Sequence, residues 1–220
     1  MPEVMIGGRM VGDGHPVYIV AELGINHTGS IDRALYQIDL AHEAGADAVK
    51  FQKRTPELSV PKHMQDVIRE TPWGPMTYME YRERVEFDEA EYTIIDAHCK
   101  MKGIQWFTSV WDEGAVAFME QFDPIAYKIG SPSLTDLHLL ETVQKTGKPI
   151  ILSTGMSTDV ELIKALMCCD VKILCHCTSI YPCPPEKLNL RCIERLNGTF
   201  HPVVGYSGHE EGTLTTVAAV

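Results

Sequence analysis

The feature that most constrains the fold is a unit of one strand followed by one helix, which recurs along most of the chain. Short continuous apolar runs alternate with stretches in which apolar residues return every three or four positions. The first pattern is typical of a strand buried on both faces, and the second of an amphipathic helix. The expected strands are 17–21, 48–52, 105–109, 126–129, 149–153, 171–177 and 202–206, and the expected helices are 31–44, 88–102, 113–121, 135–145, 158–167 and 190–196.

This repeat predicts an α/β fold of the (β/α)8, TIM-type barrel class. No Gly-x-Gly-x-x-Gly turn follows a predicted strand, which argues against a doubly wound dinucleotide-binding sheet. Residues 4–11 are expected to form a small hairpin that turns at Gly7-Gly8. With 220 residues, 45% of them hydrophobic, the chain suits one large domain.

Composition excludes several classes of protein. No apolar run approaches the roughly 20 residues that a membrane span requires, and the N-terminus lacks the basic start and apolar middle of a signal peptide. We therefore expect a cytoplasmic protein without a membrane partner. The formal net charge of −11 argues against a nucleic-acid partner or an anionic membrane surface.

The chain has seven cysteines, an odd number that favours reduced thiols over a disulfide framework. Cys175, Cys177 and Cys183, with His176, raise the alternative of a zinc site. Alternation along a strand, however, places the thiols of Cys175 and Cys177 on one face and His176 on the other. This pattern favours buried cysteines over zinc ligands.

A long segment, residues 53–86, interrupts the repeat and is rich in proline, methionine and aromatic residues. A loop of this length in a compact domain is usually functional or a disordered insertion. The aromatic residues Trp73, Tyr78 and Tyr81 favour an ordered lid or subunit contact over disorder.

Polar side chains gather where the predicted strands end, which is where barrel enzymes hold their catalytic groups. In Tyr127-Lys-Ile-Gly-Ser-Pro-Ser133, a lysine, a hydroxyl and free backbone N–H groups are suited to one phosphate or carboxylate. Burial would let a carboxylate exchange a proton, and a neutral histidine binds metals. The set is Glu22, Lys50, Gln52, Ser109, Lys128, Ser131, Ser153, Thr178, Ser179, Tyr181, Ser207 and His209.

Six stretches occur in an order and spacing that resemble the sialic acid (N-acetylneuraminate) synthase family. The resemblance implies a transferase that condenses phosphoenolpyruvate with an N-acetylated hexosamine, typically N-acetylmannosamine, and releases phosphate and a nine-carbon 2-keto acid. The stretches are Ala21-Glu-Leu-Gly-Ile-Asn-His-Thr-Gly29, Val49-Lys-Phe-Gln52, Tyr127-Lys-Ile-Gly-Ser131, Ile151-Leu-Ser-Thr-Gly-Met156, Cys177-Thr-Ser-Ile-Tyr-Pro182 and Gly205-Tyr-Ser-Gly-His209.

The resemblance also implies a role for each site residue. Glu22 would be the acid/base or sugar-positioning carboxylate, with Gln52 and Tyr181 on the sugar side. His209 would bind a divalent cofactor, Mn²⁺ or Mg²⁺, that polarises the sugar aldehyde. The residues holding phosphoenolpyruvate would be Lys50, Ser109, Lys128, Ser131, Ser153, Ser179 and Ser207.

Two departures from the family pattern shape these expectations. Ser133 stands where bacterial members often carry a glutamate that contacts the amino sugar. Val220 falls inside the expected seventh helix, so residues 1–220 are expected to form an N-terminal hairpin and a barrel truncated before strand 8. The family's second metal-binding histidine and its C-terminal antifreeze-like domain, which reaches into the partner subunit of a homodimer, would be absent.

Two alternatives to a sialic acid synthase stay open. One is a related phosphoenolpyruvate-dependent synthase that makes legionaminic acid, pseudaminic acid or a shorter keto acid. The other is a non-catalytic remnant, which would bind phosphoenolpyruvate without turning it over.

Overall fold

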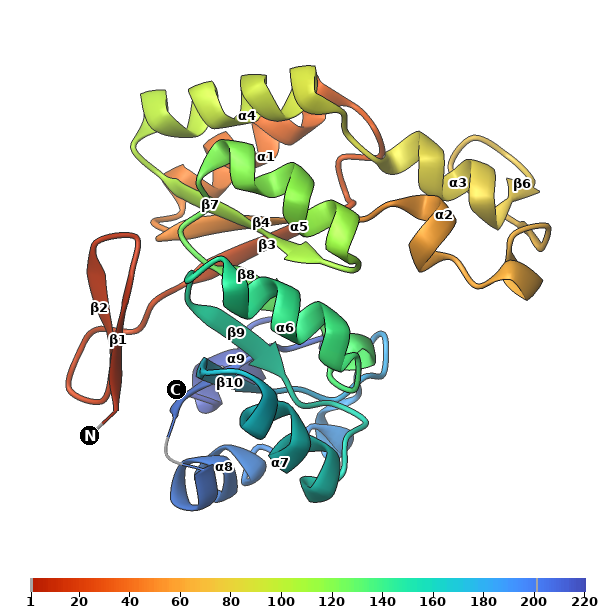
Figure 1. The fold of residues 1–220 in the computed structure, drawn as a ribbon. Coiled ribbons are helices and arrows are strands. Elements are labelled where there is room, and N and C mark those ends of the chain that lie inside the picture. The colour runs from red at the N-terminus through yellow and green to blue at the C-terminus, as the bar shows by residue number, and fades with distance from the viewer. Residues whose placement is uncertain (1, 201) are drawn as a thin grey trace. The chain divides into compact units, whose positions relative to one another are not determined.

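The computed structural model describes residues 2–200 and 202–220, and the chain divides into two compact units. One unit is Ile19–Pro124, and the other combines Met1–Tyr18 with Ile125–Val220. Each unit has its own parallel strands and its own flanking helices (Figure 1).

In the unit Ile19–Pro124, three parallel strands pair in the order β3 (Val20–Gly24), β4 (Ala48–Lys53) and β7 (Gln105–Val110). Glu22 is the register partner of Lys50, and Gln52 is the register partner of Ser109. Register partners project their side chains from the same face of a sheet. The pairing therefore brings four of the predicted site residues together.

The helices of this unit follow the apolar periodicity of the sequence. The side-chain oxygens of Ser30, Asp88 and Asp112 accept backbone N–H groups at three helix starts, as N-caps do. The helix after Ser30 buries Ala34 and Ile38, and the helix after Asp88 buries Tyr92 and Ile95. The helices are α1 (Ile31–Glu43), α4 (Glu89–Lys102) and α5 (Glu113–Met119), the last continued by a 3₁₀ turn over Glu120–Phe122.

The long segment between β4 and α4 folds into short defined elements, as expected for an ordered insertion. It starts with α2 (Pro56–Ser59) and a 3₁₀ turn at Lys62–Met64, and continues with the small hairpin β5 (Ile68–Arg69) and β6 (Met76–Thr77). It ends with α3 (Tyr78–Val85). Its role as a lid or subunit contact stays a prediction.

In the second unit, four parallel strands pair in chain order: β8 (Tyr127–Ile129), β9 (Ile150–Ser153), β10 (Val171–His176) and β11 (Val203–Tyr206). Strands β8 and β9 are buried along their whole length, as their continuous apolar runs predict. The helices are α6 (Leu137–Lys145), α7 (Asp159–Cys168), α8 (Cys192–Phe200) and α9 (Leu214–Ala218), with 3₁₀ turns at Ser131–Ser133 and Pro185–Lys187.

The predicted hairpin is present as β1 (Glu3–Ile6) and β2 (Arg9–Gly12), an antiparallel pair in the second unit. Val4 and Ile6 are buried, whereas their chain neighbours Glu3 and Met5 are exposed. This alternation is the pattern of a strand with one face against the protein.

The strand predicted at 17–21 is wrong in position, because the observed strand β3 begins at Val20. Val17 and Ile19 are about half exposed, and the N–H of Ile19 donates to the Asp47 carboxylate at 2.7 Å rather than to a neighbouring strand. The apolar run therefore starts outside the sheet.

Several predicted helix bounds also differ from the structure by a few residues. The helix expected at 190–196 runs from Cys192 to Phe200. The helix expected from residue 135 begins at Leu137, because the Asp136 carboxylate accepts the N–H of Leu139 and thereby caps it.

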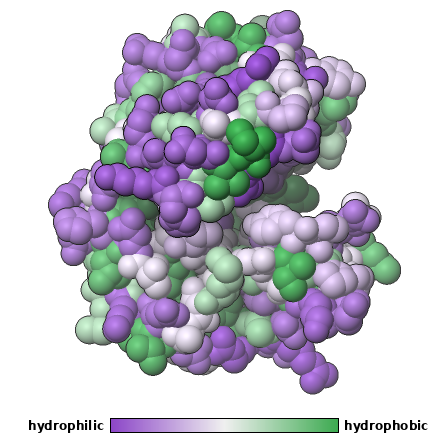
Figure 2. Space-filling model, turned by 90° about the vertical axis from the view of Figure 1, so that its right-hand side faces the viewer, coloured by the Kyte–Doolittle hydropathy of each residue, from purple (hydrophilic) through white to green (hydrophobic). Residues whose placement is uncertain are grey.

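The face drawn in Figure 2 is mostly hydrophilic, and its hydrophobic residues form separate small patches. Among the described residues, we find no helix with the length and apolar character of a membrane span.

Candidate active site

The first cluster of polar side chains lies on strands β3, β4 and β7, and it is built around a lysine. Lys50 forms an ion pair with Glu22 through its Nζ atom, which also donates to the hydroxyl of Ser109 at 2.6 Å. The Lys50 side chain is 11% exposed and the Glu22 side chain 47%. The carboxylate therefore reaches solvent, while the ammonium is held between an acid and a hydroxyl.

Gly24 makes room for this cluster. Its φ of +55° lies in the left-handed region, and a Cβ atom there would stand 3.0 Å from Glu22 Oε1 and 3.4 Å from Gln52 Nε2. A glycine is therefore suited to both the backbone conformation and the space that Glu22 and Gln52 occupy. The sequence analysis did not single out Gly24, although a glycine at a strand end is a recognisable signal of close approach.

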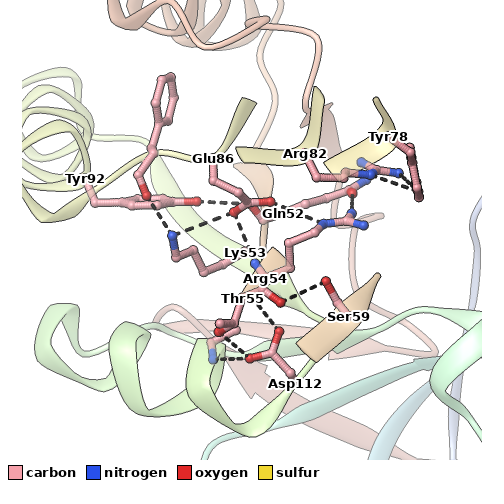
Figure 3. Close-up of polar contacts among 12 residues, drawn as sticks. Gln52, Lys53, Arg54, Thr55, Ser59, Tyr78, Arg82, Glu86, Tyr92 and Asp112 are labelled. Atoms are coloured by element: carbon pink, nitrogen blue, oxygen red, sulfur yellow. Dashed lines mark hydrogen bonds and ion pairs between the residues drawn. The ribbon is translucent and has the colours of Figure 1, made fainter. Parts of the chain in front are cut away.

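The Gln52 side chain has a polar contact on its other side (Figure 3). Its Oε1 atom accepts a hydrogen bond from Arg54 Nη2 at 2.6 Å, and its backbone carbonyl accepts one from the Tyr92 hydroxyl at 3.1 Å. Arg54 is 4% exposed and was not among the predicted site residues.

The second cluster belongs to the other unit and contains Lys128, which is 7% exposed. Its Nζ atom donates to the Ser153 hydroxyl and, at 3.4 Å, to the carbonyl of Ile129. The hydroxyl of Ser131 accepts the N–H of Gly155 at 2.9 Å and lies 3.0 Å from the Cys177 sulfur.

Gly155 lies where three of these groups converge. A Cβ atom at this position would be 2.6 Å from Ser179 Oγ, 2.7 Å from Cys177 Sγ and 2.9 Å from Ser131 Oγ. No side chain fits there without displacing them. Hydroxyl donors gathered around a glycine suit a bound oxyanion.

A cavity of about 410 Å³ opens beside Gly155. It is lined by Gly155, Cys177 and Ser179 from the cluster, by the neighbouring Thr154, and by residues up to Leu196 on α8. Neither Gly155 nor Cys177 was predicted as a site residue, although both fall within the quoted motifs.

His209 and Tyr181 contact one another near the same motifs. The Nδ1 atom of His209 lies 2.8 Å from the carbonyl oxygen of Thr178, and its Nε2 atom lies 2.9 Å from the Tyr181 hydroxyl. A carbonyl oxygen only accepts, so Nδ1 carries the proton and Nε2 of the neutral ring presents its lone pair. Ser207 is tied to β10 through its N–H, which donates to the carbonyl of His176 at 2.9 Å.

The resemblance implies a divalent metal with His209 among its ligands. The Nε2 lone pair of His209 is a suitable ligand, since a second contact on Nδ1 fixes its tautomer. Among residues 2–200 and 202–220, no group of three or more histidine, cysteine or acidic side chains is arranged to hold an ion. His209 is therefore a single candidate ligand and does not by itself form a metal site.

The cysteines that raised the zinc alternative are buried: Cys175, Cys177 and Cys183 are 7%, 5% and 2% exposed. His176 Nε2 contacts the carbonyl of Leu188 at 2.7 Å. All seven cysteines of the chain are free thiols, and the interpretation of Cys175, Cys177 and Cys183 as buried core cysteines is confirmed.

Comparison with known proteins identifies relatives along almost the whole chain. The chain is 36% identical to N-acetylneuraminate-9-phosphate synthase of Homo sapiens over 97% of its length and 61% of that protein. It is 36% identical to pseudaminic acid synthase of Campylobacter jejuni, covering 93% of this chain and 62% of that protein. The chain thus spans about three fifths of the length of the curated relatives it matches.

Solved structures agree on the fold. The crystal structure of N-acetylneuraminic acid (sialic acid) synthetase from Leptospira borgpetersenii matches 99% of this chain and 73% of that chain, with a TM-score of 0.87 and 28% identity. A truncated 3-deoxy-D-arabino-heptulosonate 7-phosphate synthase from Thermotoga maritima matches with a TM-score of 0.66 at 12% identity, which bears on the fold alone. Together with the parallel strand and helix repeat, these matches confirm the barrel class of the fold.

The family model described as NeuB matches residues 37–220, which is most of the chain. The resemblance read from the six motifs is thereby confirmed, and the chain belongs to the NeuB family.

Proposed function

We propose that this protein condenses phosphoenolpyruvate with an N-acetylated hexosamine to form a nine-carbon 2-keto sugar acid, with release of phosphate. The observation that carries the proposal is the presence of a lysine and hydroxyl cluster in each unit, on strand ends of a NeuB family chain. The names of relatives support it, since they are synthases of N-acetylneuraminate 9-phosphate, pseudaminic acid and diacetyllegionaminic acid.

The cluster around Gly155 suits the phosphate of phosphoenolpyruvate. Lys128 supplies a positive charge, and the hydroxyls of Ser131, Ser153 and Ser179 supply donors that need little reorganisation. Ser207 and the pair Lys50 and Ser109 complete the set that we assign to phosphoenolpyruvate. Preformed donors of this kind also stabilise the phosphate as it leaves, because charge builds up on its oxygens.

Glu22 is suited to proton transfer. Its carboxylate is half exposed and shares the Lys50 ammonium, one of the groups that we assign to phosphoenolpyruvate. In the reaction, C3 of phosphoenolpyruvate forms a bond to the aldehyde carbon, water adds at C2, and the C–O bond to phosphate breaks. The new alkoxide needs a proton and the added water loses one, and Glu22 is assigned to this exchange.

Gln52, Tyr181 and His209 are assigned to the sugar side of the reaction. The amide of Gln52 and the phenol of Tyr181 both supply hydrogen bonds of the kind that sugar oxygens accept. A divalent ion, Mn²⁺ or Mg²⁺, would supply polarisation of the aldehyde oxygen when bound, and His209 Nε2 would be one of its ligands. The Tyr181 hydroxyl would then give up its contact with that nitrogen.

The relatives are named for several different sugar acids, which bears on the choice of acceptor sugar. The chain is 36% identical to a pseudaminic acid synthase and 31% identical to a diacetyllegionaminic acid synthase. Because the chain is similar to enzymes named for different products, we propose an N-acetylated amino sugar as the acceptor, with N-acetylmannosamine as the first candidate.

The test is an assay of the purified protein with phosphoenolpyruvate, Mn²⁺ and a panel of N-acetylated sugars. Phosphate release that depends on one sugar, with a product mass equal to the two substrates plus water minus phosphate, is the expected result. A Lys128→Ala variant serves as the inactive control. Binding of phosphoenolpyruvate in calorimetry without phosphate release from any sugar would contradict the proposal and favour a non-catalytic binding protein.

A further inference from the structure

A nearly buried positive charge lies directly beside Gln52. Arg54 follows strand β4, and its Nη2 atom donates to Gln52 Oε1 at 2.6 Å (Figure 3). The side chain of Arg54 is 4% exposed, so this charge does not itself face a substrate in solvent. Arg54 contacts the predicted site through the side chain of Gln52.

This contact decides which way the Gln52 amide faces. A guanidinium group only donates hydrogen bonds, so the amide atom that faces Arg54 is the oxygen. The NH₂ group of Gln52 must then face the opposite side. There it lies beside Glu22, since both side chains occupy the space over Gly24 at 3.4 Å and 3.0 Å from a Cβ position.

Arg54 is itself held on several sides. Its Nε atom lies 3.2 Å from Glu86 Oε1, a contact between charges rather than a well-aligned hydrogen bond, and its backbone N–H donates to Glu86 Oε2 at 3.2 Å. The guanidinium also lies over the Trp111 ring, 4.3 Å from its centre. Burial lowers the pKa of Arg54 to about 10, which leaves it charged at neutral pH.

Glu86 in turn contacts Lys53 Nζ at 3.7 Å, and that lysine donates to the carbonyl of Phe87 at 2.7 Å. Burial raises the pKa of Glu86, and the neighbouring Lys53 and Arg54 charges oppose that rise. These contacts join the two ends of the segment 53–86 behind Gln52. The guanidinium is thus fixed in place by groups that do not reach the substrate clusters.

We propose that Arg54 is a positioning residue that holds the Gln52 amide with its NH₂ group toward the acceptor sugar, so that Gln52 donates to a hydroxyl or acyl oxygen of that sugar. This inference rests on the proposed function and names an orientation requirement within it. Without Arg54, the amide is free to turn and to present its oxygen, which cannot donate. A fixed NH₂ donor favours a sugar that has an oxygen acceptor at this point. The site loses affinity when its donor does not meet an acceptor.

The experiment is a double-mutant cycle between Arg54 and Gln52, read as separate KM values for the sugar and for phosphoenolpyruvate. We expect Arg54→Met and Gln52→Ala each to raise the KM for the sugar about tenfold, close to the loss of one hydrogen bond, with the KM for phosphoenolpyruvate within about twofold of wild type. The double variant should resemble Gln52→Ala alone, since Arg54 acts through Gln52.

Two further variants separate this role from a structural one. Arg84→Met is the matched control, because Arg84 is an arginine of the same segment whose guanidinium lies over the Trp73 ring, 4.3 Å from its centre. It should leave the sugar KM unchanged. Arg54→Lys, which keeps a donor and the charge toward Glu86, should recover part of the sugar affinity that Arg54→Met loses.

Arg54→Met removes the buried arginine that pairs with Glu86. If circular dichroism shows that this variant does not fold, the double variant Arg54→Met with Glu86→Gln replaces it. An unchanged sugar KM in either form would overturn the inference, as would additive effects of Arg54 and Gln52. A wild-type protein that turns over no sugar would instead overturn the proposed function, so the two failures are distinguishable.

Discussion

The two polar clusters differ in how their lysines are held. Lys50 shares its charge with the Glu22 carboxylate, and a further set of charged residues, Lys53, Arg54 and Glu86, lies behind Gln52 in the same unit. Lys128 is buried and donates to a hydroxyl and a carbonyl, and its neighbours around Gly155 are hydroxyls, a thiol and a backbone N–H.

The difference between the two clusters indicates a different chemical role for each. A carboxylate beside an ammonium suits proton exchange, but it weakens the attraction of that ammonium for an anion. The hydroxyl groups gathered around Gly155 suit the oxygens of a phosphate. We therefore expect loss of the Glu22 carboxylate to act mainly on the rate, and loss of Lys50 or Lys128 to act mainly on phosphoenolpyruvate affinity.

The largest effect is expected for Glu22→Gln. Removing a general acid or base lowers kcat by about 10²–10⁴-fold, whereas phosphoenolpyruvate affinity should stay level or rise because Lys50 loses its competing carboxylate. Steady-state phosphate release and calorimetric titration measure the two effects, with the exposed Glu43→Gln as the control. A loss of phosphoenolpyruvate affinity as large as the loss of kcat would break the comparison.

The next effect concerns the two lysines. Lys128→Ala and Lys50→Ala each remove a charge-assisted hydrogen bond to an anion, so each should weaken phosphoenolpyruvate binding by about 2–5 kcal/mol, with little change for the sugar. Calorimetry compares them with Lys172→Ala, a surface lysine paired with Asp170. Normal phosphoenolpyruvate KM values in both variants would contradict the assignment.

The third prediction concerns how stability depends on pH through His27 in the first unit. Burial lowers the pKa of His27, in the first unit described, from 6.5 to about 4, and the imidazole stacks on Phe87 at 4.0 Å between ring centres. Between these values the unfolded chain binds a proton that folded His27 does not. Stability from the neutral ring is therefore complete above pH 6.5 and falls as pH drops toward 4, by up to about 3 kcal/mol.

Denaturant titrations of wild type and His27→Asn at pH 7 and pH 4.5 measure this loss. Asparagine offers an acceptor for the Gly29 N–H, which His27 Nδ1 accepts at 3.1 Å, but it does not titrate. The variant should lose less stability than wild type between the two pH values. Equal losses would show that His27 is not the group responsible.

The smallest effect is expected from a single methyl group. Gly155→Ala places a Cβ against Ser131, Cys177 and Ser179, so those donors must shift and phosphoenolpyruvate affinity should fall about tenfold, roughly 1.4 kcal/mol. Gly198→Ala is the matched control, because nothing lies within 4 Å of its Cβ position on α8. It should leave affinity unchanged and stabilise the helix by up to about 1 kcal/mol. Equal affinities in both variants would remove Gly155 from the site.

Much of the fold was predictable from local pattern. Period-3.6 apolar spacing predicted helices at 31–44 and 88–102, close to the observed α1 and α4, because such periodicity is a property of neighbouring residues. Polar residues at strand ends indicated Glu22, Lys50 and Lys128 for the same reason. The six motifs also identified the family, as comparison with known proteins confirms.

Other features depended on tertiary contacts. Strand β3 begins three residues later than its apolar run, since Asp47 takes the backbone N–H of Ile19. The contact between Tyr181 and His209 joins residues far apart in the sequence. Such partners are set by strand register and loop packing, which no local window contains.

The sequence by itself determined the strand and helix repeat, the family and the residue types of the site. Only the tertiary structure decided how those residues pair: Glu22 with Lys50, Lys128 with Ser153, and Arg54 with Gln52. Arg54 and Gly155 carry no local signal strong enough to separate them from an ordinary arginine or loop glycine. Their importance comes from burial and close approach, which exist only once distant segments have packed together.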